Sequence, residues 1–189
     1  WYEKISFTYT GSLSNSITAK ENEILNQNIF KDWRNGIKHS IPVSATFTAF
    51  KYINITPSFN YTERWYSYKV NRAWDEERMR EVRDTTYGFN RVYNYNLSVS
   101  ANTKLYGFYK PLIGKKVQMI RHVFTPSVSY TLTPDFGHSR YGYYKSYTYT
   151  DEQGEVRTVD YSPYAGSLYG VPGKGRSGSI SLNVSNNVE

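Results

Sequence analysis

Three histidines are the side chains best suited to proton transfer near neutral pH: His39, His122 and His138. A hydrolase combines such a ring with a serine nucleophile and a carboxylate that orients the ring. His122 lies at the start of a predicted strand, but no acid is spaced to orient it, and the sequence has no Gly-x-Ser-x-Gly turn. We therefore predict that the chain is not an enzyme.

Residue spacing does not support metal or thiol chemistry either. The sequence has no cysteine, and its His, Asp and Glu residues show no metal-ligand spacing. We therefore expect no cofactor. The net charge is +7, from 23 Lys and Arg against 16 Asp and Glu. Because the cations are dispersed, without a basic run of five or more, we also expect no nucleic-acid partner. A phosphate-rich lipid surface suits the charge.

The composition favours β-structure. Aromatic residues make up 17% of the 189 residues, with 20 Tyr, 9 Phe and 4 Trp, and aromatic side chains favour strands. The mean hydropathy of -0.66 and the lack of a long apolar run exclude a transmembrane helix. They do not exclude a membrane barrel, because strands that alternate lipid-facing and lumen-facing residues average out as polar.

Strict alternation of apolar and polar residues predicts six antiparallel strands. In one of them, Tyr93, Tyr95, Leu97 and Val99 alternate with Asn94, Asn96, Ser98 and Ser100. The predicted strands lie near 2–14, 36–50, 52–69, 87–103, 119–132 and 178–187. Each is long enough to cross a bilayer at a tilt, which takes roughly 9–11 residues.

The links between these strands alternate in length. A tight turn is predicted near residues 50–52 and a moderate link over 104–117, whereas 15–36, 70–86 and 133–178 are long. Short periplasmic turns and long extracellular loops are typical of an antiparallel transmembrane β-barrel. Six strands would leave two open edges in lipid, which is costly. We therefore expect residues 1–189 to be a partial outer-membrane barrel domain, a segment of a larger barrel.

The three long links differ in character. Leu25, Ile29 and Trp33 have helical spacing in the first, so one or two helical turns are possible there. The second is dense in charge and could extend its hairpin above the membrane. The third is rich in tyrosine and contains a predicted turn at Gln153-Gly154.

The alternation assigns side chains to two environments. The polar residues, at every second position of a strand, are predicted to line a hydrated lumen, and the residues between them are predicted to face lipid. The candidate lumen-facing residues are Asn60, Thr62, Asn94, Asn96, Ser98, Ser127 and Ser129. The candidate lipid-interface residues are Arg91, Tyr61, Trp65 and Tyr93. For Arg91 we favour simple interfacial placement over contact with a lipid phosphate.

Three prolines fall inside predicted strands: Pro42, Pro57 and Pro126. Proline lacks the N–H that a sheet ladder uses, so it is usually confined to edges and bulges. We favour local bulges that bend the sheet at these positions. The alternative is weakened pairing beside a lateral opening.

Four stretches resemble the barrel of LptD-like lipopolysaccharide-assembly outer-membrane proteins. They are NGIKHSIPVS at 35–44, SFNYTERW at 58–65, YNYNLSVSANTKLYG at 93–107 and RHVFTPSVSY at 121–130. The resemblance implies a barrel of about 26 strands, located in the cell outer membrane. It further implies an LptE-like lipoprotein plug in the lumen and periplasmic bridge proteins that deliver lipopolysaccharide, which leaves sideways into the outer leaflet.

Two other function classes remain open from the residues alone. A porin or nutrient receptor that passes polar solutes would show the same polar lining. A soluble β-sandwich that binds glycans through tyrosine-rich loops would be soluble without detergent. We expect a translocon component that inserts lipopolysaccharide into the outer leaflet of the outer membrane.

Overall fold

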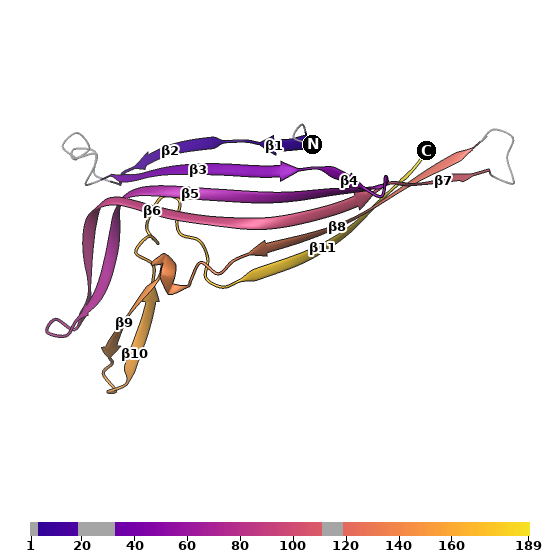
Figure 1. The fold of residues 1–189 in the computed structure, drawn as a ribbon. Coiled ribbons are helices and arrows are strands. Elements are labelled where there is room, and N and C mark those ends of the chain that lie inside the picture. Colours follow the sequence, from indigo (N-terminus) through magenta and orange to yellow (C-terminus); the bar gives the residue numbers. More distant parts are fainter. Residues whose placement is uncertain (1–3, 19–32, 111–118) are drawn as a thin grey trace.

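The fold is an antiparallel sheet whose strands follow one another in chain order (Figure 1). The computed structural model describes residues 4–18, 33–110 and 119–189. The sheet contains β1 (Ile5–Phe7), β2 (Thr10–Ser16), β3 (Arg34–Ala45), β4 (Phe47–Ala49), β5 (Ile53–Asp75), β6 (Arg80–Thr103), β7 (Leu105–Tyr109), β8 (Ile120–Thr133) and β11 (Ser177–Val188). Between β8 and β11 lie the short 3-10 helix η3 (Ser139–Tyr141) and a hairpin of β9 (Lys145–Thr150) and β10 (Val156–Tyr161).

These strands form six rows, as the alternation predicts. Both β1 and β2 pair with β3, β4 continues β3 along β5, and β7 continues β6 along β8, each without a change of register. The all-β, antiparallel prediction is confirmed. Among the described residues the sheet stays open, with the first row and β11 as its two edges.

The tight turn between β4 and β5 consists of Phe50, Lys51 and Tyr52. Phe50 and Lys51 both have positive φ, 50° and 68°, and the Tyr52 amide donates to the Ala49 carbonyl at 3.2 Å. Positive φ at both central residues matches the right-handed twist of the flanking strands. The predicted turn at 50–52 is therefore confirmed.

Strands continue into two of the links. The charged link extends its hairpin, as the sequence allows. The charged link over 70–86 continues as strand to Asp75 and resumes at Arg80, so β5 and β6 extend the hairpin well past the predicted ends at 69 and 87. The link predicted over 104–117 contains β7, which pairs with β8. The possible helical turns of the first link fall largely on residues 19–32, outside the described residues.

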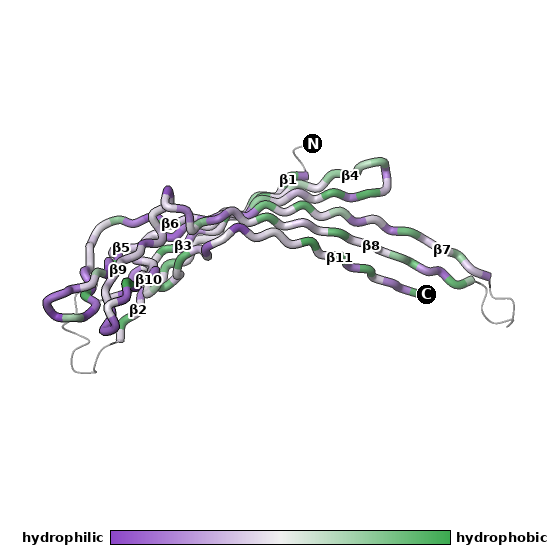
Figure 2. Tube along the Cα trace, turned by 90° about the horizontal axis from the view of Figure 1, so that it is seen from below, coloured by the Kyte–Doolittle hydropathy of each residue, from purple (hydrophilic) through white to green (hydrophobic). Residues whose placement is uncertain are grey.

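A bulge bends the long β5–β6 hairpin. The register shifts by one residue between Tyr66 and Tyr68, opposite Gly88, whose φ of 149° suits glycine. Beyond this point the hairpin turns away from the plane of the sheet (Figure 1). Its tip is hydrophilic (Figure 2), and the β9–β10 hairpin lies beside it, where Trp74 and Tyr149 have ring centroids 4.6 Å apart.

The prolines do not produce the expected bulges. Pro42 pairs with Asn60, Pro57 with Val99 and Pro126 with Val184 without a change of register. On the other side of Pro42 and of Pro126 the pairing is interrupted, between β1 and β2 and between β6 and β7. Backbone carbonyls at these sites still pair: the Pro42 carbonyl accepts from the Thr8 amide at 3.2 Å. The expectation of local bulges at these residues is therefore wrong.

The tyrosine-rich segment between β8 and β11 folds onto the sheet and supplies a small core. Tyr66 and Val92 of the sheet are buried against Phe136, Tyr143 and Tyr164 of this segment. The predicted turn at Gln153-Gly154 is confirmed between β9 and β10, where the Gly154 amide donates to the Asp151 carbonyl at 2.9 Å. No described helix is long and apolar enough to span a membrane.

Candidate functional site

The two faces of the sheet differ in chemistry because directly opposed residues share a face. The register places Asn60 opposite Asn96, Ser58 opposite Ser98 and Phe59 opposite Leu97. In the same way, Ser129 lies opposite Ser100, and Tyr130 opposite Val99. One face is therefore lined with Asn, Ser and Thr (the polar face), and the other with aliphatic and aromatic side chains (the apolar face).

Cross-strand hydrogen bonds run along the polar face. The Asn60 Nδ2 donates to the Asn96 Oδ1 at 2.9 Å, and the hydroxyls of Ser58 and Ser98 lie 2.5 Å apart. All seven residues predicted to line a lumen lie on this face: Asn60, Thr62, Asn94, Asn96, Ser98, Ser127 and Ser129. These neutral side chains offer donors and acceptors without a fixed charge, which suits a hydrated surface.

At the loop end of the polar face, the segment 164–173 crosses the sheet (the strap). The Tyr66 hydroxyl donates to the Gly170 carbonyl at 2.7 Å. The Arg64 Nε donates to the Tyr169 carbonyl at 3.1 Å, and its Nη1 donates to the Asn94 Oδ1 at 2.6 Å. The Tyr169 hydroxyl reaches the Ser12 carbonyl of β2 at 3.2 Å. The strap thus joins β2 and β5 on one side of the sheet.

The apolar face carries an aromatic band at the same level. The Tyr9 hydroxyl lies 2.8 Å from the His39 Nδ1, and the His39 ring lies 4.2 Å from Trp65. Trp65 in turn contacts Phe89 edge-on, with ring centroids 5.5 Å apart. One aromatic side chain from each of four neighbouring rows therefore forms a continuous band.

The four predicted interface residues converge on a carboxylate beside this band. Glu63 accepts from the Trp65 Nε1 at 2.6 Å, from the Arg91 Nε at 2.7 Å, and from the Tyr61 hydroxyl. The Arg91 Nη2 also donates to the Tyr61 hydroxyl at 2.9 Å, and its guanidinium lies 5.0 Å from the Tyr93 ring centroid. The side chain of Glu63 is 13% exposed and that of Arg91 is 52% exposed. Arg91 is therefore one half of a neutral pair.

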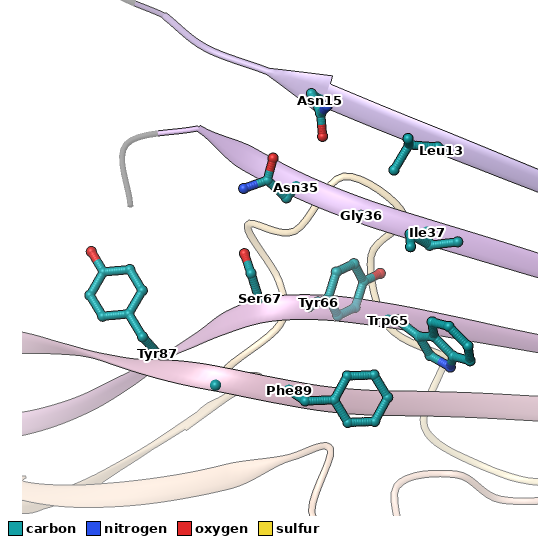
Figure 3. A pocket seen from close by; sticks show the side chains of 11 residues that line it. Leu13, Asn15, Asn35, Gly36, Ile37, Trp65, Tyr66, Ser67, Tyr87 and Phe89 are labelled. Carbon is teal, nitrogen blue, oxygen red and sulfur yellow. The ribbon is translucent and has the colours of Figure 1, made fainter. Parts of the chain in front are cut away.

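A hollow of about 650 Å³ opens above the aromatic band, at the bend of the β5–β6 hairpin (Figure 3). Its apolar wall includes Leu13, Ile37, Trp65 and Phe89, and Ser67 also lines it. The Ser67 Oγ is buried without a hydrogen-bond partner among the described residues. The hollow lies on the apolar face and shares Trp65 and Phe89 with the aromatic band.

His122 and His138 form hydrogen bonds with neighbouring polar groups. The His122 Nε2 lies 3.1 Å from the Asn186 Oδ1, and the His138 Nδ1 accepts from the Arg140 amide at 3.2 Å, capping η3. Within residues 4–18, 33–110 and 119–189, no three His, Asp or Glu side chains group as a metal site would require.

Several residues of these sites escape sequence reasoning. Lys38 is not predicted as a site residue, because only the register of β3 with β5 places it opposite Arg64. Glu63 is visible as a charge of lipid-facing parity, but its role depends on a partner from the next strand. Tyr143 and Tyr169 come from a segment whose path no local pattern specifies, and their targets lie far along the chain.

The fold and the site define a class: an antiparallel meander with one polar and one apolar face, and an elaborated loop end. The family model described as LptD protein matches residues 1–189, so the chain belongs to the LptD protein family. The resemblance drawn from the four sequence stretches is confirmed. Neither the curated proteins nor the solved structures contain a match.

Proposed function

We propose that this chain is a wall segment of an outer-membrane translocon that inserts lipopolysaccharide into the outer leaflet, without enzymatic activity of its own. The observation that carries the proposal is the match of the LptD family model across the whole chain. The two-faced sheet supports it, because a membrane barrel needs an apolar outer surface and a polar lumen.

The spacing of the aromatic residues supports a placement in the membrane. Trp65 of the aromatic band lies 12 positions after Ile53, the first residue of β5. At about 3.3 Å per residue and a tilt of about 45°, this distance spans roughly 28 Å along the membrane normal. The apolar band of an outer-membrane barrel is about 25 Å tall. We propose that the band marks the outer interface and that the 50–52 turn is periplasmic.

The same placement assigns roles to the two faces. On the polar face, the Asn, Ser and Thr side chains would exchange hydrogen bonds with saccharide hydroxyls or with a plug protein. The apolar face would contact lipid acyl chains. The neutral Glu63–Arg91 pair lowers the cost of placing a cation on this face, a cost of about 0–1 kcal/mol near the interface, where the aromatic band lies.

By family membership we also propose the partners: lipopolysaccharide as cargo, periplasmic bridge proteins that supply it, an LptE-like lipoprotein in the lumen, and outer-membrane lipid around the barrel. Passage is passive in this proposal. The polar face guides the saccharide while parted strands admit the acyl chains to the bilayer.

Photocrosslinking in cells tests the function. In the full-length parent protein, a photoreactive residue replaces Thr62 or Ser127 on the polar face, with Leu97 and Val128 on the apolar face as matched controls. We expect lipopolysaccharide adducts at Thr62 and Ser127 that disappear when upstream transport is blocked. Adducts at Leu97 should persist, because they come from lipid already in the membrane, and Val128, near the periplasmic end of the apolar face, should give none.

If neither Thr62 nor Ser127 forms lipopolysaccharide adducts in a folded, inserted protein, the translocon assignment is contradicted. Conductance through the purified barrel would then favour a porin or nutrient receptor instead.

A further inference from the structure

Two cations oppose each other on the polar face. Lys38 of β3 lies directly opposite Arg64 of β5 in the register, so both side chains project from the same side of the sheet. Arg64 donates to Asn94 of β6 and to the Tyr169 carbonyl rather than to a carboxylate, so both side chains leave positive charge on this part of the polar face.

The described residues around the pair supply no negative charge. The polar-face positions of β2, of β3, of β5 up to Tyr66 and of β6 from Asn90 include no Asp or Glu. The two hydrogen-bond acceptors of Arg64 are neutral, the Tyr169 carbonyl and the Asn94 side chain. The neighbouring carboxylate of Glu63 belongs to the apolar face, where it pairs with Arg91.

The strap covers this pair without neutralising it. Residues 164–173, YAGSLYGVPG, carry no charged side chain. The ring of Tyr169 lies 6.0 Å from the Lys38 Nζ, and its hydroxyl is fixed 2.8 Å from the Ser14 Oγ. Lys38 and Arg64 are both half-buried. Partial removal from water strengthens the attraction between these cations and an anion that reaches them.

We propose that Lys38 and Arg64 form a binding site for a phosphate or carboxylate group carried on a sugar. The Tyr169 ring offers a flat surface beside the site, and the Asn and Ser ladder of β5 and β6 offers hydrogen bonds to the adjoining hydroxyls. The inference rests on the proposed function and specifies what the polar face recognises: the acidic saccharide portion of the cargo.

Substitutions at Lys38 test the site, because the Lys38 ammonium makes no hydrogen bond that would be lost from the described fold. Lys38→Glu places a carboxylate opposite Arg64 and so fills the site from within, and Lys38→Arg retains the charge. Lys104→Glu is the matched control: it changes the net charge equally at an exposed position beyond the end of β6.

Titration calorimetry on the full-length protein with its partner, in detergent, measures binding. The probes are a phosphorylated core oligosaccharide, the same oligosaccharide after phosphatase treatment, and inorganic phosphate. We expect Lys38→Glu to weaken binding of the phosphorylated probe about tenfold or more, since a charge-assisted contact is lost. Lys38→Arg and Lys104→Glu should stay within about twofold of the unsubstituted protein.

Three results would overturn the proposal. One is equal affinity of the Lys38→Glu and unsubstituted proteins for the phosphorylated oligosaccharide. Another is inorganic phosphate binding as tightly as the oligosaccharide, which would indicate a site for the free ion. The third is that Lys38→Glu loses the co-purified partner protein while its saccharide affinity stays unchanged. This would show that Lys38 and Arg64 contact the partner protein instead.

A folding readout separates the site from a structural role. Lys38→Glu should melt at the same temperature as the unsubstituted protein or higher, because it places a carboxylate opposite Arg64 in the register. A lower melting temperature would contradict the inference that the positive charge of Lys38 and Arg64 has no counter-ion in the fold. The crosslinks at Ser127 report on the proposed function separately. If they form while Lys38→Glu leaves the affinity for the phosphorylated oligosaccharide unchanged, the anion site is wrong and the translocon assignment is not affected.

Discussion

At the scale of single residues, charge is placed differently on the two faces. Glu63 and Arg91 neutralise each other on the apolar face, and Tyr61 and Trp65 complete the hydrogen bonds of the carboxylate. Lys38 and Arg64 remain unneutralised on the polar face. This contrast is the expected result if one face meets lipid and the other meets water and an acidic cargo.

Removing the carboxylate from the apolar face should destabilise the protein. Glu63→Gln leaves Arg91 without its counter-ion, and we expect a loss of about 1–2 kcal/mol, below the value for a fully buried pair because Arg91 is half exposed. Urea unfolding of the full-length barrel followed by gel mobility measures the effect. The double substitution Glu63→Gln with Arg91→Met should recover most of the loss. A single variant as stable as the unsubstituted protein would contradict a role for the pair.

One loop carboxylate should give the tyrosine-rich segment a pH dependence. Asp135 accepts hydrogen bonds at 2.7 Å from the amides of Gly137 and Gly175, which tie the two ends of the segment together. These two bonds hold the pKa of Asp135 below its ordinary value of 3.8. The stabilisation is therefore present above the ordinary pKa and is lost as pH falls through the lowered value.

We expect Asp135→Asn to loosen the base of the segment at pH 6, because charge-assisted bonds to the two amides are lost. Hydrogen exchange of residues 134–144 should be faster in the variant at pH 6. The two proteins should converge as pH falls below the lowered pKa. Exchange rates that match at pH 6 would show that the carboxylate does not hold the segment.

At the scale of elements, the segment between β8 and β11 substitutes for a missing strand neighbour. Pairing of β6 with β8 begins only at Leu97, so the edge of β6 closer to the loops is open. There the Tyr93 amide donates to the Tyr143 hydroxyl at 2.7 Å, and that hydroxyl donates to the Tyr93 carbonyl at 3.1 Å. A side chain thus satisfies backbone groups that would otherwise be left unpaired.

Tyr143→Phe should expose this edge. Losing both bonds should cost about 1–2 kcal/mol, and the Tyr93 amide should exchange faster with solvent. Tyr149→Phe is the control, because the Tyr149 ring packs on Trp74 in the outer hairpins. Hydrogen exchange and urea unfolding of the full-length protein distinguish the two variants. Equal behaviour of both would mean that Tyr143 does not cover the edge.

The elements were predictable where one local pattern dominates. The alternation over 87–103 indicates a strand directly, and Phe50 and Lys51 were placed in the turn because two alternating runs meet there. The outer part of the β5–β6 hairpin carries charges on both faces, so alternation does not reveal it. The strap was not predictable, because Tyr66 and Gly170 meet only through the tertiary fold.

The same limit applies to the site. Parity assigns Asn60 and Tyr61 to opposite faces from the sequence alone, and the register agrees. Parity cannot show that Arg91 reaches Glu63, since the contact depends on the register between two strands about 30 residues apart. For the same reason the opposed positions of Lys38 and Arg64 become visible only once β3 and β5 are aligned.

At the scale of the whole molecule, both faces and both edges of the sheet need partners. The apolar face exposes large side chains: Leu13 is 69% exposed, Phe89 70% and Leu182 80%. Both sides of β11 are exposed along its length. A sheet with this surface would aggregate as an isolated soluble protein. In the proposed barrel, lipid on one face, water or a plug on the other, and further strands at each edge would cover these surfaces.

Spin labelling along β6 tests this two-sided environment most directly. Residues 1–189 contain no cysteine, so within them a cysteine introduced at Leu97, Ser98, Val99 or Ser100 is the only one that a nitroxide labels. Any cysteine elsewhere in the full-length protein is first replaced by serine. In the full-length protein in bilayers, we predict high oxygen collision rates at 97 and 99 and high rates with a water-soluble nickel complex at 98 and 100. Collision rates that do not alternate along these four positions would contradict a sheet with lipid on one face and water on the other.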